Sequence, residues 1–333
     1  AGGCATGGFV RRATGRRPAL LPMTWHFIAE GTLIGLAVGA IYALIALGFA
    51  LLYKSTKILN LAHGELVLFG GYLAIALSTA LPGPPVLAFV LAVLATLAAA
   101  ALLGFAVERA VMRPLFGQPL LSVIIVTLAL GYVVRGVMVG LWGGDTRLFP
   151  PVVPTGVFRL PLPRLEALAV PQVGVWAALV AAVLLVVFSL FFRYSLWGIA
   201  MRAAANEQLT ASALGVSLKR VFAVAWAFAA AAASVGGILL GLWLGVNFAL
   251  GFVGLKALAA VILGGLDSIA GAILGGVIIG VTENLLGAYI DARVRLFGVP
   301  LHGFKEITPF LIILLVLLVR PYGLFGTEHV ERL

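Results

Sequence analysis

Apolar residues follow one another in long runs along nearly the whole chain, and short polar stretches separate these runs. Segments such as Val90–Ala101 are apolar on every face, so they lack the alternation of a barrel strand and the polar stripe of a surface helix. A run of about twenty apolar residues is long enough to cross a hydrocarbon layer of roughly 30 Å as a helix. The pattern therefore predicts an all-α, polytopic integral membrane protein built as a helical bundle.

Nine apolar runs are candidates for membrane spans. The well-defined runs are Gly31–Tyr53, Asn60–Leu81, Val86–Val107, Leu120–Leu141, Val173–Phe192 and Val221–Val246. Val253–Leu266 and Ile269–Leu286 flank a break at residues 264–268, and Ile307–Val319 is the last run. Because Val253–Leu266 is short, it is either a span or a re-entrant half-helix buried against its neighbours. The two readings predict about nine and about eight crossings respectively.

The chain before the first apolar run has a different composition. Residues 1–22 are rich in Gly and Arg and contain no long apolar stretch. We therefore expect these residues to be an extension outside the working protein, with Met23 as its start. Residues 23–333 are expected to form a single transmembrane domain.

Composition and charge agree with this class. The chain is 62% hydrophobic and 10% charged, whereas a soluble domain carries about a quarter charged residues. The net charge of +10 does not indicate nucleic acid binding, because Lys and Arg lie in short clusters at the ends of apolar runs. These residues are Lys54, Lys57, Arg109, Arg113, Arg193, Arg202, Lys219, Arg220 and Arg320. Placing them in the cytoplasm puts residues 23–30 outside and the C-terminus inside.

The sequence offers little for an enzyme. It contains no Gly-rich phosphate-binding loop and no His-Glu-x-x-His or similar metal-ligand spacing. The histidines all fall near the ends of predicted spans, so none forms a recognisable nucleophile and base pair; they are His26, His63, His302 and His329. We expect no catalytic residues, no metal and no cofactor, and any nucleotide energy must be supplied through another chain.

A polar motif stands at the entrance to the second predicted span. Asn60, His63 and Glu65 lie close together in front of an apolar run, with Gly64 between the last two. One interpretation is a helix start, with Asn60 as the N-cap and Glu65 favourably placed against the helix dipole. The other is that these groups bond one another or face a water-filled space, because polar groups in the membrane are costly otherwise.

The segment from Arg202 to Gly215 is polar enough to lie outside the membrane and is predicted to form one short helix that ends at Gly215. Leu209, Ala213 and Leu214 would share one side of it. Such a side either docks into a groove on a partner or lies on the lipid surface. The residues that we expect to act in docking are Arg202, Ala203, Ala204, Asn206, Glu207, Ala211, Leu214 and Gly215.

Glycines recur at a four-residue spacing in several runs. The sets are Gly31, Gly35 and Gly39; Gly237, Gly241 and Gly245; and Gly271, Gly275, Gly276 and Gly280. This spacing puts small residues on one helix face, which lets two helix backbones approach closely in lipid. The pattern predicts a tightly packed bundle and does not identify a substrate.

Seven stretches in a fixed order resemble the H-type permease of high-affinity branched-chain amino acid ABC importers, over Gly31 to Gly326. They are Tyr42–Phe49, Leu59–Glu65, Glu108-Arg109 with Arg113-Pro114-Leu115, Arg202–Gly215, Gly254–Ala257 with Leu263-Gly264-Gly265, Gly271–Gly280 and Arg320–Gly326. Two positions depart from the family pattern: Leu61 stands where an aromatic residue is usual, and Asp267 where a small residue is commoner. The resemblance implies a multi-pass permease of the bacterial inner membrane.

The same resemblance implies how such a permease works. Transport would proceed by alternating access with a second homologous permease, two ATPase subunits and a periplasmic or extracellular substrate-binding protein. Arg202–Gly215 would be the helix that docks on the ATPase, and the Asn60 to Glu65 motif falls at a family hallmark. Permeases for urea or short-chain amides resemble the same pattern and are the alternative.

A zwitterionic substrate needs polar partners inside the membrane and an aliphatic pocket. The candidates for the transport pathway are Thr127, Asn247, Thr282, Glu283 and Asn284. Arg135 lies close to the outer end of its span, so we expect it to extend to the interface instead. A self-contained secondary carrier or channel would be expected to show a repeated pair of broken helices, and only one clear break, at residues 264–268, is present.

Overall fold

The computed structural model describes residues 25–160, 168–293, 295–296, 299–300 and 303–326. The predicted extension at residues 1–22 and the predicted start at Met23 lie outside these residues. The α-helices are α1 (Trp25–Thr56), α2 (His63–Ala80), α3 (Pro85–Val107), α4 (Leu120–Trp142), α5 (Gln172–Tyr194), α6 (Leu196–Asn206), α7 (Gln208–Ala213), α8 (Leu218–Leu244), α9 (Val253–Gly264), α10 (Ile269–Arg293) and α11 (Phe304–Val319).

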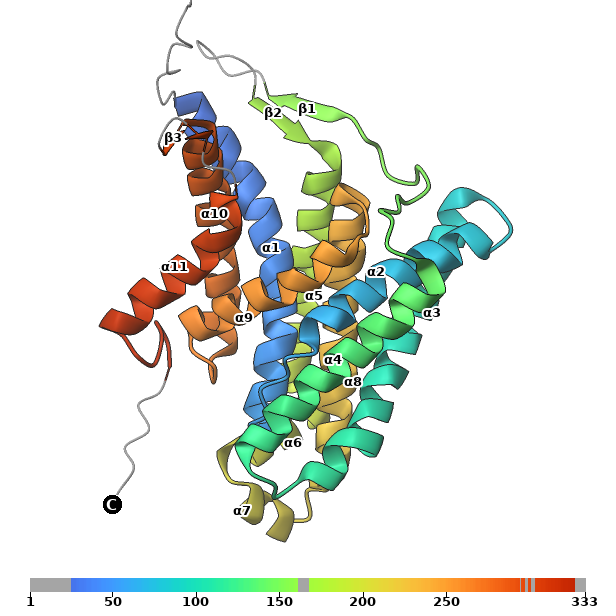
Figure 1. The fold of residues 1–333 in the computed structure, drawn as a ribbon. Coiled ribbons are helices and arrows are strands. Elements are labelled where there is room, and N and C mark those ends of the chain that lie inside the picture. The colour runs from blue at the N-terminus through green and yellow to red at the C-terminus, as the bar shows by residue number, and fades with distance from the viewer. Residues whose placement is uncertain (1–24, 161–167, 294, 297–298, 301–302, 327–333) are drawn as a thin grey trace, which may run out of the picture.

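Shorter elements join some of these helices. They are the π-helical turn η1 (Glu108–Met112), the 3₁₀ turns η2 (Arg113–Leu115) and η3 (Phe248–Phe252), and the strands β1 (Val157–Leu160), β2 (Leu168–Pro171), β3 (Arg295–Leu296) and β4 (Val299–Pro300). The strands form two antiparallel hairpins, β1 with β2 and β3 with β4. The helices make up the rest of the described architecture (Figure 1), which confirms the predicted helical membrane bundle.

Six helices in the described part of the chain have the length and hydropathy of a membrane span. They are α1, α3, α4, α5, α8 and α10. The other three predicted spans correspond to shorter helices. These are α2 with 18 residues, α9 with 12 and α11 with 16. At 1.5 Å per residue, α9 is about 18 Å long and cannot cross a layer of roughly 30 Å. The structure therefore favours the re-entrant reading of Val253–Leu266.

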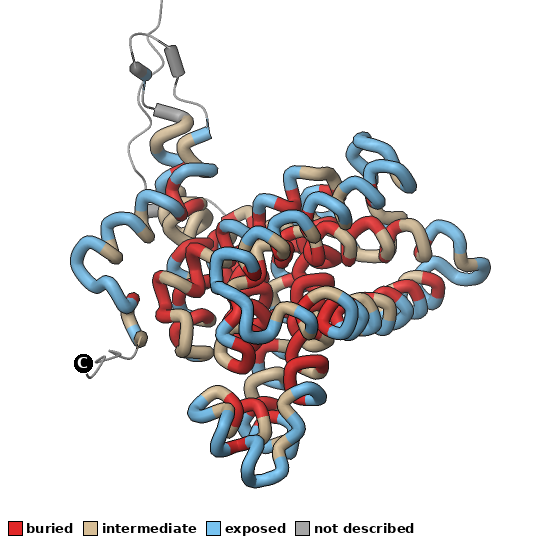
Figure 2. The backbone as a smooth tube through the Cα atoms, turned by 60° about the horizontal axis from the view of Figure 1, so that its bottom comes forward, coloured by how far each residue is buried: buried red, intermediate tan, exposed pale blue. Residues whose placement is uncertain are grey.

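The central helices are α1 and α8. In the most apolar window of each, 78% of the residues are buried, against 22% for α3, 17% for α4 and 22% for α5. Figure 2 shows this buried centre and the exposed outer helices. The many exposed Leu and Val side chains of α3, α4 and α5 are suited to lipid, in which an apolar surface is not costly.

Glycines provide the close contacts between helices, as their spacing predicts. A Cβ atom on Gly280 of α10 would collide with the backbone of Gly39 of α1, and one on Gly237 of α8 would collide with the carbonyl of Val67 in α2. Gly275 of α10 is packed in the same way against α9. Gly245 differs, because it ends α8 with φ +79°.

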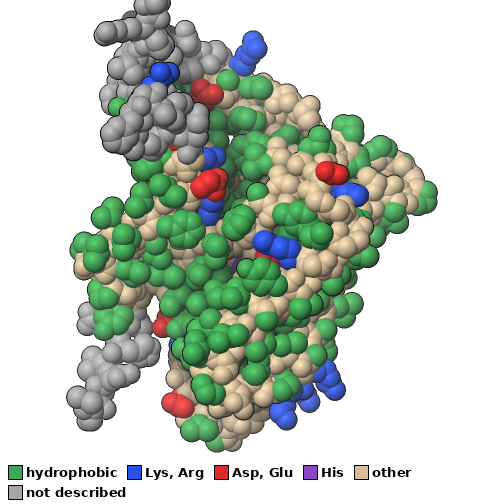
Figure 3. Space-filling model, in the orientation of Figure 1, with side chains coloured by type: hydrophobic (Ala, Val, Ile, Leu, Met, Phe, Trp, Pro, Cys, Tyr) green, Lys and Arg blue, Asp and Glu red, His purple; other side chains and the backbone are tan. Residues whose placement is uncertain are grey.

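The two ends of the bundle have different character. The short helices α6 and α7 project at the lower end in Figure 1, and the β1–β2 hairpin lies at the upper end. The basic residues at the C-terminal ends of α1 and α5 and at the start of α8 belong to the lower end, where Figure 3 shows a group of Lys and Arg side chains. The predicted basic clusters are thus gathered on one side of the bundle.

Candidate functional site

The motif at the start of α2 lies inside the bundle. After Thr56 the chain turns back at Lys57, which has φ 58°. The imidazole Nε2 of His63 then lies 3.1 Å from the carbonyl oxygen of Ile45. Ile45 precedes the end of α1 by eleven residues, or about 16 Å along the helix axis. The second predicted span therefore begins in the interior and not at the membrane surface.

Asn60 is not the N-cap of α2. That position is held by Ala62, which makes no side-chain cap, and Asn60 Oδ1 instead accepts a hydrogen bond of 3.0 Å from the Ala62 N–H in the preceding turn. The Nδ2 of Asn60 and the Nδ1 of His63 are buried and have no hydrogen-bond partner among the described residues. The interpretation of Asn60 as the N-cap is therefore wrong, although the helix does start here with Glu65 in its first turn.

A second short helix meets α2 at this point. Gly64 in the first turn of α2 and Gly254 in the first turn of α9 pack backbone against backbone, and a Cβ atom on either would collide with the other chain segment. Two helix N-termini, each with a partial positive charge, therefore converge in the interior. Discontinuous helices of this kind surround the binding sites of many transporters.

Glu65 forms an ion pair with Arg135 of α4 across this junction. Arg135 donates from Nε to Glu65 Oε2 at 3.1 Å and from Nη2 to Oε1 at 2.5 Å. The guanidinium also lies 5.7 Å from the ring centre of Phe252. The side chains are 12% exposed for Glu65 and 28% for Arg135. The expectation that Arg135 extends to the interface is wrong, because a carboxylate inside the bundle holds it.

The pair borders a small cavity of about 130 Å³. Polar side chains of the motif, Asn60, His63 and Glu65, line it together with Tyr132 and Arg135. This volume is below the range of about 300–1,000 Å³ that is typical of small-molecule sites.

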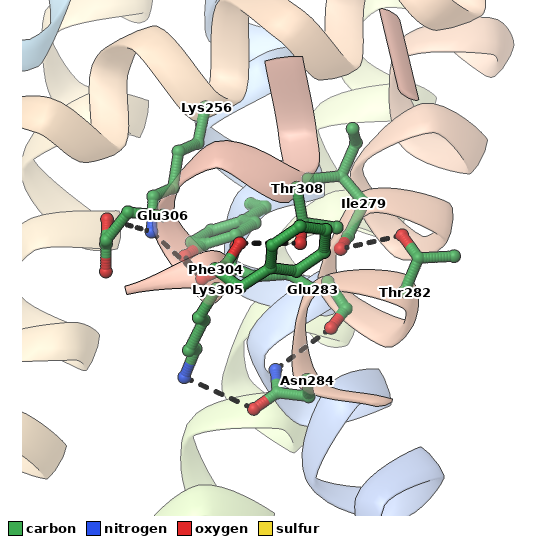
Figure 4. Close-up of polar contacts among 11 residues, drawn as sticks. Lys256, Ile279, Thr282, Glu283, Asn284, Phe304, Lys305, Glu306 and Thr308 are labelled. Carbon is green, nitrogen blue, oxygen red and sulfur yellow. Dashed lines mark hydrogen bonds and ion pairs between the residues drawn. The ribbon is translucent and has the colours of Figure 1, made fainter. Parts of the chain in front are cut away.

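A second ionic group lies further along α9, and we call it the Lys256 cluster. It consists of Lys256 of α9, Glu283 of α10 and Glu306 of α11 (Figure 4). The ammonium nitrogen of Lys256 lies 2.9 Å from Glu283 Oε1 and 2.8 Å from Glu306 Oε2. The side chains are 7% exposed for Lys256, 0% for Glu283 and 64% for Glu306.

The carboxylate of Glu283 is only partly satisfied. Its Oε1 also receives a long hydrogen bond of 3.5 Å from the hydroxyl of Tyr42. Its Oε2 is buried and has no hydrogen-bond partner among the described residues. A buried acceptor without a donor costs free energy, so this oxygen is suited to a donor that arrives from elsewhere.

The Lys256 cluster borders a much larger cavity, of about 620 Å³. Sites for small molecules are typically about 300–1,000 Å³ and mostly apolar, with a few polar groups. The apolar wall includes Ile34, Val38, Leu240, Trp243, Leu250 and Val253. The polar part includes Tyr42, Asn247, Asn284 and Lys305 besides the cluster itself, and Lys305 Nζ lies 3.4 Å from Asn284 Oδ1. The cavity combines an aliphatic wall with charges of both signs.

The structure divides the predicted pathway residues into two groups. Asn247, Glu283 and Asn284 line the large cavity. Thr127 instead supports the α2 motif, because its hydroxyl oxygen accepts a hydrogen bond of 3.3 Å from the Leu61 N–H. Thr282 does not line either cavity, and its hydroxyl donates 2.6 Å to the carbonyl of Ile278 on its own helix.

Sequence reasoning missed Lys256, Glu306 and the role of Arg135. Lys256 stands in one of the stretches that carry the family resemblance, and a lysine inside the apolar run Val253–Leu266 was a signal that it needed a counter-ion. The carboxylate that supplies it, Glu283, is 27 positions away, and Arg135 is 70 positions from Glu65. Such distances leave no local pattern.

The predicted docking segment is not one helix. It divides at Glu207, which has φ −154° and ψ 106° and separates α6 from α7. Arg202 faces inward, because it bonds the carbonyl of Phe192 and lies over the ring of that residue. Ala204 and Ala211 are buried. Ala203 is half-buried. The remaining predicted docking residues are exposed, namely Asn206, Glu207, Leu214 and Gly215.

The exposed side of α7 is apolar. Leu209 and Leu214 are each 81% exposed at the tip of the projection. Gly215 has φ +88°, the left-handed backbone with which a glycine commonly ends a helix. The N–H groups of Gly215 and Val216 bond the carbonyls of Ser212 and Ala211, both at 3.0 Å. This pattern is a Schellman ending, which needs a residue with positive φ.

No group of three or more His, Cys, Asp or Glu side chains is arranged for a metal ion within the described ranges. The polar groups inside the bundle are carboxylates, ammonium and guanidinium groups, amides and hydroxyls, most of them in pairs. This chemistry fits the binding and release of a charged or zwitterionic molecule.

Comparison with known proteins gives one family. Residues 31–319 match the family described as "Branched-chain amino acid transport system / permease component". The high-affinity branched-chain amino acid transport system permease protein LivH of Salmonella typhimurium is 32% identical over 90% of this chain and 95% of its own length. BraD of Pseudomonas aeruginosa is 30% identical over 94% of this chain and all of its own. A probable branched-chain amino acid transport permease protein LivH of Methanocaldococcus jannaschii is 27% identical over 90% of this chain and 92% of its own length. Among solved structures, a chain of PsaBC from Streptococcus pneumoniae in complex with Fab aligns over 90% of this chain and 94% of its own, with a TM-score of 0.42 and 17% identity.

Proposed function

We propose, from the premise that this chain belongs to the family of branched-chain amino acid transport permeases, that it carries these amino acids into the bacterial cytoplasm by alternating access. It is a multi-pass membrane protein and the permease component of an ABC transport system, not an enzyme itself. Such a system has further subunits, and the sequence of this chain has no nucleotide-binding loop. ATP hydrolysis is therefore assigned to partner chains.

The partners proposed are a second homologous permease, two ATPase subunits and a substrate-binding protein on the outer side. The end of the bundle that carries the basic clusters and the α6–α7 projection faces the cytoplasm and the ATPases, in keeping with the excess of Lys and Arg in cytoplasmic loops. This orientation puts the β1–β2 hairpin outside, where the binding protein arrives, and the C-terminus inside. The membrane is the bacterial inner membrane.

One observation carries the proposed coupling to the ATPases. Leu209 and Leu214 are each 81% exposed on a projection that extends beyond the bundle at its basic end. A helix of six residues has less than two turns and offers only a small apolar area to a lipid surface. A short helix with exposed leucines, ended by a rigid Schellman turn, is instead suited to insertion in a groove on another protein.

Alternating access requires an element with two arrangements. The junction of α2 and α9 supports such a role, because two short helices begin there inside the bundle and touch through glycine backbones. The ion pair of Glu65 and Arg135 joins α2 to α4 at the same place. We propose that this ion pair is part of a gate, meaning the contact that opens and closes the transport pathway. The gate stays closed as long as the two side chains remain bonded.

The substitution Gly215→Val tests the coupling. A β-branched residue at positive φ costs roughly 1–2 kcal/mol, which shifts a docking equilibrium by roughly five- to thirtyfold. In a reconstituted four-subunit transporter we expect the binding protein to capture leucine as before, and ATP hydrolysis to lose its response to the leucine-loaded binding protein.

Gly143→Val is the matched control. Gly143 ends α4 at the opposite side of the bundle with φ +75°, and a Cβ atom there meets no other atom within 4 Å, as at Gly215. The control should keep the response of ATP hydrolysis to the loaded binding protein. An unchanged response in a normally assembled Gly215→Val transporter would contradict the proposed coupling.

A further inference from the structure

We propose that the cavity beside the Lys256 cluster is a binding site for the α-amino acid during its passage through the permease. Lys256 would hold the carboxylate of the substrate, Glu283 would hold its ammonium group, and Glu306 would occupy the place of the substrate carboxylate when the site is empty. The proposal rests on the proposed function, because it takes the transported molecule to be an amino acid.

The charges of the cluster have the arrangement that a zwitterion requires. One ammonium group, on Lys256, stands between two carboxylates at 2.8 and 2.9 Å. A substrate carboxylate that replaces the carboxylate of Glu306 leaves the number of ion pairs at Lys256 unchanged. A substrate ammonium group has three donors, and the fully buried Oε2 of Glu283 lacks one among the described residues.

Glu306 and Glu283 differ in how easily each can leave Lys256. Glu283 is fully buried in the middle of α10, so release from its counter-ion would strand a charge in the bundle. Glu306 is 64% exposed in the first turn of α11, directly after Gly303, which has φ +88°. The carboxylate of Glu306 is largely exposed already, so a released Glu306 remains in contact with water. Glu306 is therefore the exchangeable partner.

The rest of the cavity fits an aliphatic side chain. Val38, Leu240 and Val253 belong to its apolar wall and come from three different helices. The volume of about 620 Å³ leaves room for an amino acid and several water molecules. The apolar residues of the wall would contact the side chain of the substrate, and its backbone groups would lie toward Lys256 and Glu283, whose positions Figure 4 shows.

The test measures binding without transport. The assembled permease and ATPase complex is purified in detergent without the substrate-binding protein, and its melting temperature is followed as L-leucine is added. A ligand that binds only the folded protein raises the melting temperature. Two analogues complete the set, leucinol, which lacks the carboxylate, and 4-methylvalerate, which lacks the ammonium group. We expect stabilisation by L-leucine and at least tenfold weaker effects of both analogues.

Two variants separate the roles of the cluster. Lys256→Met should raise the leucine concentration for half-maximal stabilisation at least tenfold. Glu306→Gln removes a competing carboxylate and should lower that concentration roughly two- to fivefold, as expected for an exposed pair. Lys57→Met is the control, because its ion pair with Asp267 at 2.7 Å lies at the other end of α9 and borders neither Lys256 nor the cavity.

The leucine-binding measurements can fail independently of the Gly215→Val experiment on coupling. No stabilisation of the unaltered complex by leucine, equal binding by Lys256→Met, or weaker binding by Glu306→Gln would each overturn the proposed site. If Lys256→Met does not assemble, the two analogues and Glu306→Gln still decide. Failure of the Gly215→Val prediction would leave leucine binding at Lys256 intact, so the two proposals fall separately.

Discussion

The Glu65–Arg135 pair and the Lys256 cluster are both ionic, both inside the bundle and both next to α9, yet their surroundings differ. Glu65 and Arg135 use both carboxylate oxygens and two guanidinium nitrogens, and glycine backbones close the junction beside them. The Lys256 cluster has two carboxylates for one ammonium group, an unsatisfied oxygen and an adjoining cavity of about 620 Å³.

The difference separates two uses of buried charge. A charge pair with matched geometry joins helices, and breaking it leaves an uncompensated charge. A group with an unsatisfied oxygen at a cavity can take a further partner, which a substrate can supply. We therefore expect changes at the first site to affect stability or gating, and changes at the second to affect substrate binding and transport, with a loss of stability as well where a change leaves Glu283 without Lys256.

The largest effect is expected for Gly64→Ala. A Cβ atom at this position would collide with the carbonyl oxygen of Gly251, and the neighbour is backbone that cannot turn away. Overpacking of this kind costs about 3 kcal/mol. Membrane abundance and melting temperature in detergent should both fall. Gly136→Ala on α4 is the control, because a Cβ atom there meets nothing within 4 Å; a stable Gly64→Ala protein would mean that the junction is not closed.

Arg135→Met is expected to come next. It leaves the carboxylate of Glu65, 12% exposed, without its counter-ion inside the bundle. We expect a loss of about 2 kcal/mol, below the 3–5 kcal/mol of a fully buried pair, because this pair is partly exposed. The melting temperature of the purified protein measures it.

Glu65→Gln separates stability from gating at the same pair. An amide oxygen still accepts a hydrogen bond from Arg135, and Arg135 is 28% exposed, so the protein should remain in the membrane at near-normal abundance. Leucine uptake should fall several-fold, because the charged interaction between residue 65 and Arg135 is lost. Normal uptake by a well-expressed Glu65→Gln variant would contradict a role of this ion pair in gating.

Ile34→Trp should affect transport more than stability. Ile34 is half-buried in the wall of the large cavity, so a larger ring has space to enter it. We expect leucine uptake by reconstituted vesicles to fall about tenfold, equivalent to about 1.4 kcal/mol, with little change in melting temperature. Leu33→Trp is the control, because Leu33 is exposed and does not line the cavity. Equal uptake by the two variants would argue against a substrate in this cavity.

The smallest effect is expected for Lys57→Met. The ion pair with Asp267 has a distance of 2.7 Å, but its side chains are 42% and 24% exposed. Pairs of this kind contribute less than about 1 kcal/mol, so stability and uptake should both stay within about twofold of normal. A larger loss in either assay would show that charge at this end of α9 also matters.

Much of the architecture could be predicted because its cause is local. Long apolar runs produce the central and outer helices, and spaced glycines produce the contact of Gly39 with Gly280. The left-handed Gly215 follows from a helix ending in a known pattern. Asn247, Glu283 and Asn284 could be selected as polar residues beside apolar runs, and all three line the large cavity.

The rest depends on contacts between distant parts of the chain. Nothing near Arg135 indicates Glu65, so an arginine close to a span end was expected at the interface. The start of α2 inside the bundle depends on a turn at Lys57 with positive φ, which is rare for a lysine. The break at Glu207 likewise has no Gly or Pro to mark it.

The most direct test of the central claim, that the Lys256 cluster holds the substrate during transport, is the number of leucine molecules imported per ATP hydrolysed by the Lys256→Met transporter in vesicles. We predict that the loaded binding protein still stimulates ATP hydrolysis, because the α6–α7 projection is unchanged, while leucine import falls at least tenfold. The ratio should therefore collapse by the same factor. An unchanged ratio in a fully assembled Lys256→Met transporter would contradict the account.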